Sequence, residues 1–245
     1  MIEKYVTNSA NLDDNALDDS FNKVLELCVA NSYNKVTLNI PTKRHLEDLN
    51  NILGASLIKN LKKNNNGEFN GIQITLTTAN LEISEWTEDI ILSLYPTSKM
   101  IDNLNDLKRA KAIIVVPWID KEREDWIKTW NPEIISGGEI EVDSLNIDPR
   151  SEKALFILTD MVNLSSGLTH TSDREKTIQL LRILHKKGIN LNPDDMRIWA
   201  LQNGWNSDAS SRLYEIAEGV IRGKKFRTTG QKIWTDKIID KILGT

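Results

Sequence analysis

Two short segments of the 245-residue chain place hydroxyl groups and cations directly after a predicted strand, where a helix would begin. The residues concerned are Thr42, Lys43, Arg44, Ser98 and Lys99. A helix start has free backbone amides and the positive end of the helix dipole, so hydroxyls and cations at this position suit a phosphate or a carboxylate. We therefore predict that these residues bind a small anionic ligand.

Trp118 directly follows the last predicted strand of the same region, where its ring could stack on a nucleotide-like ligand. Each of these assignments has a plainer alternative. Thr42 and Ser98 are good N-caps in any fold, because their hydroxyls accept hydrogen bonds from first-turn amides. Trp118 could equally be a core residue that fastens a helix to the sheet.

Known catalytic and cofactor motifs are missing from the sequence. No Gly-x-Gly-x-x-Gly follows the first predicted strand, and neither a Walker-type phosphate loop nor a Gly-x-Ser-x-Gly turn occurs. A classical dinucleotide, nucleoside triphosphate or serine-hydrolase site is therefore not expected. The cofactor stays unknown.

A metal site is not predicted either. The three histidines, His45, His170 and His185, show no metal-binding spacing. The single cysteine, Cys28, permits no internal disulfide and no cysteine-based zinc cage. An acidic run contains Asp13, Asp14, Asp18 and Asp19, but it lacks the ligand spacing and the glycine of an EF-hand loop.

A basic segment near the C-terminus is the sharpest charge feature of the chain. It contains Arg222, Lys224, Lys225 and Arg227. It follows two predicted helices, 192–203 and 207–221, whose three-residue turn resembles a helix-turn-helix in spacing. The second helix, however, carries acidic residues that DNA would repel. The segment is predicted to contact a partner, either nucleic acid or protein.

The net charge of −4 is divided unevenly along the chain. Residues 151–245 contain 15 Lys and Arg against 11 Asp and Glu, whereas residues 1–150 contain 16 against 24. This asymmetry supports two domains. No signal peptide is visible, and no apolar run reaches the roughly 20 residues of a membrane span. A cytoplasmic protein without membrane contact is expected.

Five apolar or alternating runs predict strands in the first domain, at residues 2–6, 35–40, 72–76, 90–94 and 112–116. Helical patterns lie between most of them, including one long apolar stripe over 42–61 that Thr42 could cap. This order predicts a doubly wound, mostly parallel α/β sheet over residues 1–150. Residues 62–71 are predicted as a turn and 133–150 as a connector, in which 139–145 could add an edge strand.

Residues 151–245 predict a small all-α bundle of four or five helices. A capping-box pattern at Ser172–Glu175, an Asn-Pro start at 192–193, a cap at Ser207 and a last helix from about 231 mark its elements.

Together these patterns favour a ligand-responsive module, in which the α/β domain binds a small anionic or nucleotide-like ligand and the helical domain relays this to a partner. Two alternatives stay open. One is a nucleotide- or nucleic-acid-processing enzyme with a site assembled across strand ends, and the other is a scaffold that binds only proteins.

Overall fold

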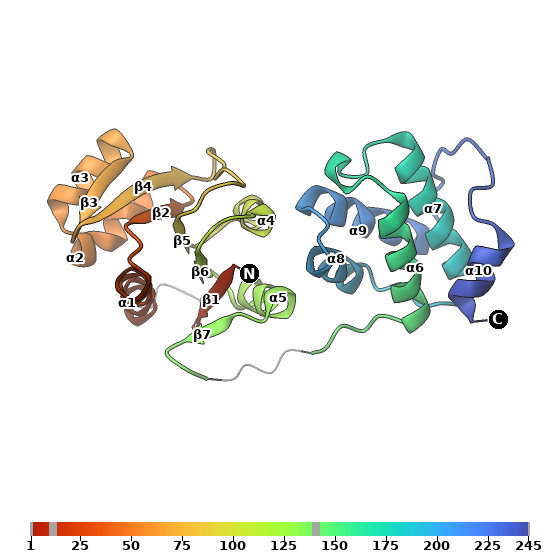
Figure 1. Ribbon diagram of the computed structural model, residues 1–245, viewed down its shortest axis with the longest axis horizontal. Coiled ribbons are helices and arrows are strands. Elements are labelled where there is room, and N and C mark those ends of the chain that lie inside the picture. Colours follow the sequence, from red (N-terminus) through yellow and green to blue (C-terminus); the bar gives the residue numbers. More distant parts are fainter. Residues whose placement is uncertain (1, 10–13, 139–142, 245) are drawn as a thin grey trace. The chain divides into compact units, whose positions relative to one another are not determined.

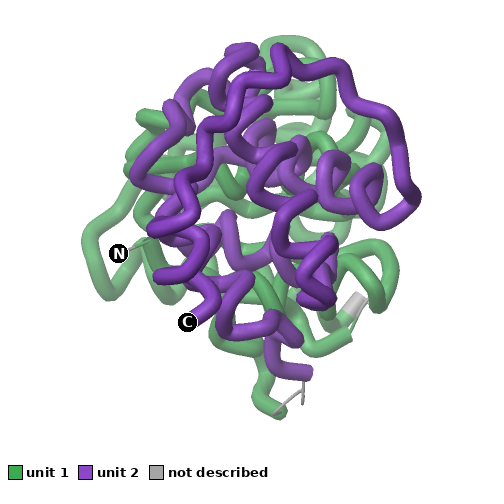
Figure 2. The backbone as a smooth tube through the Cα atoms, turned by 90° about the vertical axis from the view of Figure 1, so that its right-hand side faces the viewer, with its two compact units in different colours: residues 1–142 green, residues 143–245 purple. Residues whose placement is uncertain are grey.

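The computed structural model describes residues 2–9, 14–138 and 143–244, and the chain divides into two compact units, residues 1–142 and 143–245 (Figures 1 and 2). Each unit has its own apolar core. The first helix of unit 2, α6, begins at Pro149, two residues before residue 151, where the sequence predicts that the helical domain starts. Within the described residues, no helix is long and apolar enough to cross a membrane.

Unit 1 is built on one sheet, which has seven strands in the described residues, in the order β3-β4-β2-β5-β6-β1-β7. The strands are β1 (Glu3–Thr7), β2 (Lys35–Ile40), β3 (Asn66–Phe69), β4 (Ile72–Thr78), β5 (Ile90–Leu94), β6 (Ala112–Val116) and β7 (Glu133–Ile135). Every neighbouring pair is parallel except β3 and β4. The predicted α/β fold with a mostly parallel sheet is therefore confirmed.

The two strands that the sequence pattern did not predict lie at the two edges of the sheet. The turn predicted over residues 62–71 contains β3, which forms a hairpin with β4 through Asn70 and Gly71. Both turn residues have positive φ, 50° and 79°, as a two-residue Asn-Gly hairpin requires. Strand β7 begins inside the predicted connector. Of the predicted edge strand 139–145, residues 139–142 lie outside the described residues and 143–145 are not in a strand.

Helices cover both faces of the sheet. One face, called here the α1 face, carries α1 (Asp14–Asn31), the 3₁₀ helix η1 (Lys43–Leu49), α2 (Asn50–Leu53) and α3 (Ala55–Asn64). The other, the α4 face, carries α4 (Ser98–Asp106) and α5 (Asp120–Trp130). The single helix predicted over 42–61 is wrong. It is divided at Gly54, whose φ of 77° no helix can accommodate.

The two faces have separate cores because side chains alternate along each strand. Leu38, Leu92 and Ile114 pack on the α1 face, whereas Ile91 and Ile113 pack on the α4 face. The strands are thus buried on both sides, as in other parallel sheets.

Unit 2 is a bundle of α-helices with one short 3₁₀ turn in the described residues, which confirms the predicted helical domain. Its elements are α6 (Pro149–Met161), η2 (Leu164–Ser166), α7 (Thr171–Lys186), α8 (Pro193–Gln202), α9 (Ser207–Ile221) and α10 (Asp236–Leu243). Their apolar sides enclose a core that contains Leu155, Leu181, Trp199, Leu213 and Trp234.

The helix boundaries of unit 2 differ from the sequence pattern in detail. Asn192 caps α8 as predicted, with its side chain accepting a hydrogen bond from the Asp195 amide. The cap of α9 is Asn206 rather than Ser207. The capping box predicted at Ser172 is wrong, because α7 begins at Thr171. His170, two residues before Ser172, occupies the cap position without a side-chain bond.

Candidate ligand site at the carboxyl edge of the sheet

The connections that leave β2 and β5 diverge to opposite faces of unit 1, although these two strands are neighbours. The chain after β2 continues into η1 on the α1 face, and the chain after β5 continues into α4 on the α4 face. In open α/β sheets, ligands bind beyond the carboxyl ends of strands at such a switch point. The ends of β2, β5 and the adjacent β6 therefore define where a ligand site is expected.

Three aromatic rings form a row across these strand ends. Tyr95 directly follows β5, and its ring centroid lies 6.0 Å from that of His45 in η1. On its other side it lies 5.3 Å from the ring of Trp118, which follows β6 by two residues. Tyr95 is buried, whereas 43% of Trp118 is exposed. The buried tyrosine thus supports an exposed tryptophan that could stack on a planar ligand.

Tyr95 also has an unusual backbone conformation. Its φ is 52°, in the left-handed region that favours glycine, and its amide donates to the Val116 carbonyl oxygen at 2.8 Å. Backbone strain of this kind costs on the order of 1–3 kcal/mol and is concentrated at functional sites. No local sequence signal marks Tyr95, because a tyrosine in an apolar segment is ordinarily a core residue.

The structure brings three of the predicted ligand residues to neighbouring strand ends: Thr42 after β2, Ser98 after β5 and Trp118 after β6. Thr42 occupies the N-cap position of η1, as predicted, but its side chain makes no cap hydrogen bond. Its Oγ1 lies 3.2 Å from Nδ1 of His45, so the hydroxyl orients the imidazole ring. Thr97, rather than Ser98, caps α4 by accepting a bond from the Met100 amide, which leaves Ser98 exposed.

The predicted cations are placed differently from one another. Lys43 donates to the carbonyl oxygen of Lys62 at 2.7 Å, so its charge sits at the C-terminal end of α3. Lys99 pairs with Glu82 at 3.1 Å. Arg44 is exposed and has no ion pair among the described residues. Of the three, Arg44 is the cation available to an anionic ligand.

A row of buried polar side chains comes from the residues that precede the last residue of each of three neighbouring strands. Thr77, Asn39 and Ser93 are aligned across β4, β2 and β5, and their alternation places them on the α4 face. All three are buried, and within the described residues Thr77 Oγ1 and Ser93 Oγ have no hydrogen-bond partner. Buried polar atoms normally have partners, so these hydroxyls are available to water or to a ligand group.

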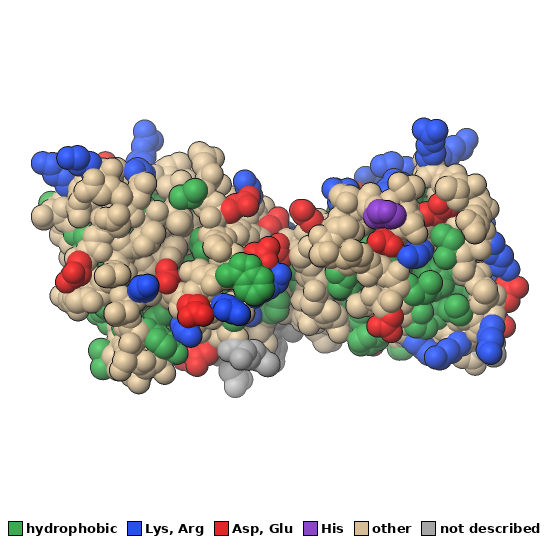
Figure 3. All heavy atoms as spheres, turned by 45° about the horizontal axis from the view of Figure 1, so that its top comes forward, with side chains coloured by type: hydrophobic (Ala, Val, Ile, Leu, Met, Phe, Trp, Pro, Cys, Tyr) green, Lys and Arg blue, Asp and Glu red, His purple; other side chains and the backbone are tan. Residues whose placement is uncertain are grey.

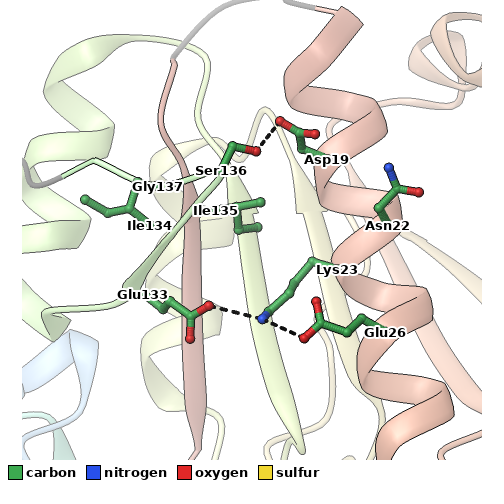
Figure 4. A pocket seen from close by; sticks show the side chains of 9 residues that line it. All are labelled: Asp19, Asn22, Lys23, Glu26, Glu133, Ile134, Ile135, Ser136 and Gly137. Carbon is green, nitrogen blue, oxygen red and sulfur yellow. Dashed lines mark hydrogen bonds and ion pairs between the residues drawn. The ribbon is translucent and has the colours of Figure 1, made fainter.

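A hollow also runs between α1 and β7 (Figure 4) and reaches the carboxyl ends of β1 and β7. Two adjoining cavities of about 440 and 220 Å³ share Asp19, Ile135 and Ser136 in their walls. Their other polar lining comes from Thr7, Asn8, Ser9, Asn15, Asn22, Lys23, Glu26 and Glu133. Carboxylates and amides favour ligand groups that donate hydrogen bonds, such as hydroxyls or amines, over a phosphate.

The contacts within this hollow neutralise its one lysine. Lys23 reaches Glu133 at 3.1 Å and Glu26 at 3.3 Å, and the Ser136 hydroxyl donates to Asp19. Burial by itself lowers the pKa of Lys23, but the bonds to the two carboxylates outweigh it and hold the pKa above its ordinary value. Lys23 therefore carries a paired positive charge.

No set of three His, Cys, Asp or Glu side chains in the described part of the chain could hold a metal ion. Of the acidic run in the sequence, Asp13 and the Asp14 side chain lie outside the described residues, and Asp19 belongs to the hollow. On the face drawn in Figure 3, basic and acidic side chains of unit 1 are interspersed rather than separated.

The basic segment of unit 2 forms part of an extended connection between α9 and α10. Arg222 pairs with Glu218 at 2.8 Å, and Lys224 lies 5.5 Å from the ring centroid of Phe226. Lys225 and Arg227 are exposed. Asp208 and Glu215 are exposed on α9 itself, which agrees with the acidic character read from the sequence.

Fold and site together define a two-unit protein, in which a doubly wound α/β unit has a candidate ligand site and a helical unit carries a basic surface. Residues 147–243 are similar to the family described as Domain of unknown function (DUF1889). This match covers the helices of unit 2. No curated protein and no solved structure matches the chain.

Proposed function

We propose that unit 1 binds a small nucleotide-like ligand at the carboxyl edge of its sheet, and that unit 2 relays the bound state to a protein or nucleic-acid partner. The observation that carries the proposal is the aromatic row, because the strained, buried Tyr95 holds the half-exposed Trp118 at the ends of β5 and β6. A cytoplasmic location stays a prediction from the sequence.

The surroundings of the row suggest how such a ligand would lie. A planar base would stack on Trp118. The sugar and the anionic group bonded to it would extend along the row toward Arg44. The polar edge of the base would face the hollow beside β1, where Asn8, Ser9 and Asp19 provide hydrogen-bond donors and acceptors.

Affinity measurements on matched variants test the stacking role. In calorimetric titrations of the full chain with adenosine, guanosine and their phosphates, at least one ligand should bind saturably. Trp118→Ala should weaken binding by about 5- to 150-fold, because base–aromatic stacking contributes roughly 1–3 kcal/mol. Trp86→Ala is the control. Trp86 is also exposed, but it precedes β5 and so lies on the side of the sheet where this strand begins, away from its carboxyl end.

The charge requirement is tested separately. Arg44→Ala should weaken the binding of a nucleoside triphosphate more than the binding of the corresponding nucleoside. Lys43→Ala should mainly lower the stability of the fold, because it removes the hydrogen bond to the Lys62 carbonyl oxygen. The proposal fails if no ligand binds in the millimolar range, or if Trp118→Ala binds as tightly as the unchanged protein.

One arrangement at the site favours an enzyme as the second candidate. Thr42 engages Nδ1 of His45 through both its hydroxyl and its carbonyl oxygen, which leaves Nε2 for a ligand. A histidine held in this way can transfer a proton. Analysis of the titrated nucleotides for products distinguishes this candidate, because a binding module returns them unchanged and an enzyme does not.

A further inference from the structure

The connection between α9 and α10 in unit 2, residues 222–235, is held across α7 by a series of hydrogen bonds, and we call it the basic strap. The amide and hydroxyl of Thr229 donate to the buried carboxylate of Glu175 at 2.9 and 2.8 Å. Farther along, the Ile233 amide donates to Gln179, and the Trp234 indole donates to the Lys176 carbonyl oxygen at 2.9 Å. The strap therefore has a defined course, and its cations have defined positions.

The first half of the strap folds back onto α9. The Lys224 amide donates to the Gly219 carbonyl oxygen at 2.8 Å, and the Phe226 ring packs directly on Gly219. A Cβ atom at Gly219 would lie 2.6 Å from Cζ of Phe226, so only glycine admits the ring at this distance.

Three cations surround the Phe226 ring. Arg174 and Arg182 of α7 approach it with Cζ atoms 5.6 and 5.5 Å from its centroid, and Nζ of Lys224 lies at 5.5 Å. Cation–π attraction is weak at exposed sites and offsets little of the repulsion among three like charges. In the described residues, neither arginine has an ion pair.

A small cavity of about 60 Å³ opens beside Phe226 and two of these cations, Arg174 and Lys224, and we call it the basic hollow. Arg174, Arg212, Lys224, Glu215 and Phe226 contribute to its wall. Its volume is about that of two water molecules in the liquid. It therefore has room for the oxygens of one anionic group, and three cations against one carboxylate face that space.

We propose that the basic hollow binds a single phosphate monoester, carried either by a small phosphorylated molecule or by a phosphorylated side chain of a protein partner. Clusters of arginines recognise phosphate through paired, charge-assisted hydrogen bonds, and an incoming dianion would relieve the repulsion around Phe226. The site is separate from the ligand site of unit 1 and does not depend on it.

Single-group recognition fits the surroundings better than binding along a nucleic-acid backbone. Glu215 lies in the wall itself, and Glu218 and Asp208 lie on the same helix, where an extended polyanion would meet them. Glu218 is in addition the partner of Arg222, which keeps that cation outside the hollow.

The test uses the full chain, with inorganic phosphate and a blocked Gly-phosphoserine-Gly tripeptide as probes and the unphosphorylated tripeptide as the blank. Calorimetry should give a dissociation constant of about 1 mM or tighter for at least one probe. Similar affinities would identify the phosphate group alone as the ligand, and tighter binding of the tripeptide would identify a phosphorylated side chain.

Arg174→Gln and Arg212→Gln should each weaken phosphate binding about tenfold or more, since a hydrogen bond to a charged group is worth roughly 1.5–3 kcal/mol. Arg222→Gln is the matched control and should change affinity less than twofold. A cooperative thermal unfolding transition without phosphate verifies that each variant is folded. Phosphate should then raise the unfolding midpoint of the unchanged protein more than that of Arg174→Gln or Arg212→Gln.

Two results would overturn the assignment. One is the absence of phosphate binding through the millimolar range, or binding that all three variants retain. The other is tight, steeply salt-dependent binding of an oligothymidylate without terminal phosphate, because this would make the basic strap a nucleic-acid surface.

Discussion

The rings of Tyr95 and Trp118 meet edge to face, with centroids 5.3 Å apart and planes inclined at 82°. Each ring follows a different strand of the sheet, so their contact connects the ends of β5 and β6. Such a pair contributes about 0.5–1.5 kcal/mol beyond the area that it buries. Because Tyr95 is buried and its backbone is fixed by Val116, the tyrosine determines where the exposed tryptophan lies.

Replacement of Tyr95 by valine should be far more harmful than replacement by phenylalanine. Phenylalanine keeps the ring and should cost about 1 kcal/mol for the lost hydroxyl. Valine removes the ring, and because it is β-branched it is strained at a φ of 52°. The free energy of unfolding should therefore fall by about 3–5 kcal/mol. Urea unfolding measures both values. Similar losses for the two variants would show that the conformation of Tyr95 is not enforced.

Ser93→Ala should leave stability unchanged or raise it by up to about 1 kcal/mol, because Ser93 Oγ is buried without a partner in the described residues. Ser20→Ala is the comparison. Ser20 is equally buried, but its hydroxyl donates to the Leu17 carbonyl oxygen at 2.8 Å, so its loss should cost about 1 kcal/mol. If Ser93→Ala is the more harmful of the two in urea unfolding, a water or ligand partner must hold the Ser93 hydroxyl.

Asp173 should make the stability of unit 2 depend on pH. Burial by itself raises the pKa of this carboxyl, but hydrogen bonds from Lys176 and from the Asn163 amide outweigh burial and hold the pKa below its ordinary value. Such a group stabilises the fold above its unfolded pKa of about 3.9, and this contribution is lost as the pH falls through the lower, folded pKa.

Asp173→Asn should therefore cost about 1–3 kcal/mol at pH 7, and the difference from the unchanged protein should shrink as the pH falls below about 4. Thermal unfolding across this pH range provides the measurement. Asp160→Asn, at an exposed position on α6, should show no comparable cost. A difference for Asp173→Asn that stays constant down to pH 2 would contradict the assigned hydrogen bonds.

Gly219 and Phe226 should behave as a coupled pair. Gly219→Ala alone should cost about 1–3 kcal/mol, because the new Cβ overlaps the Phe226 ring. In a Phe226→Ala background the same change should stabilise by about 0.5–1 kcal/mol, since alanine is the better helix former. A double-mutant cycle in urea measures the coupling. Additive effects would mean that the strap does not pack on α9 in solution.

The sequence predicted a strand wherever the segment carries a clear hydrophobic or alternating pattern. The five central strands carry dense β-branched or alternating patterns, and their positions were predicted to within two residues at either end. The edge strand β3 is polar, because one side of an edge strand faces water, and its Asn-Gly turn was the only local signal. Strand β7 is three residues long, which is too short for any periodicity.

The sequence by itself determined the class of the fold, the helical character of unit 2 and the short list of segments that follow strands. Only the tertiary structure decided which of these segments meet. Strand order brought the residues after β2, β5 and β6 together, and it revealed Tyr95 as a neighbour of both His45 and Trp118. It likewise placed Arg174 and Arg182 beside Phe226 and brought Arg174 and Arg212 into one cavity wall, although no local pattern marks these arginines. The reason is physical. Local patterns report the burial and periodicity of a segment, whereas a site depends on contacts between distant segments, and these are fixed only when the strands pair and the helices pack.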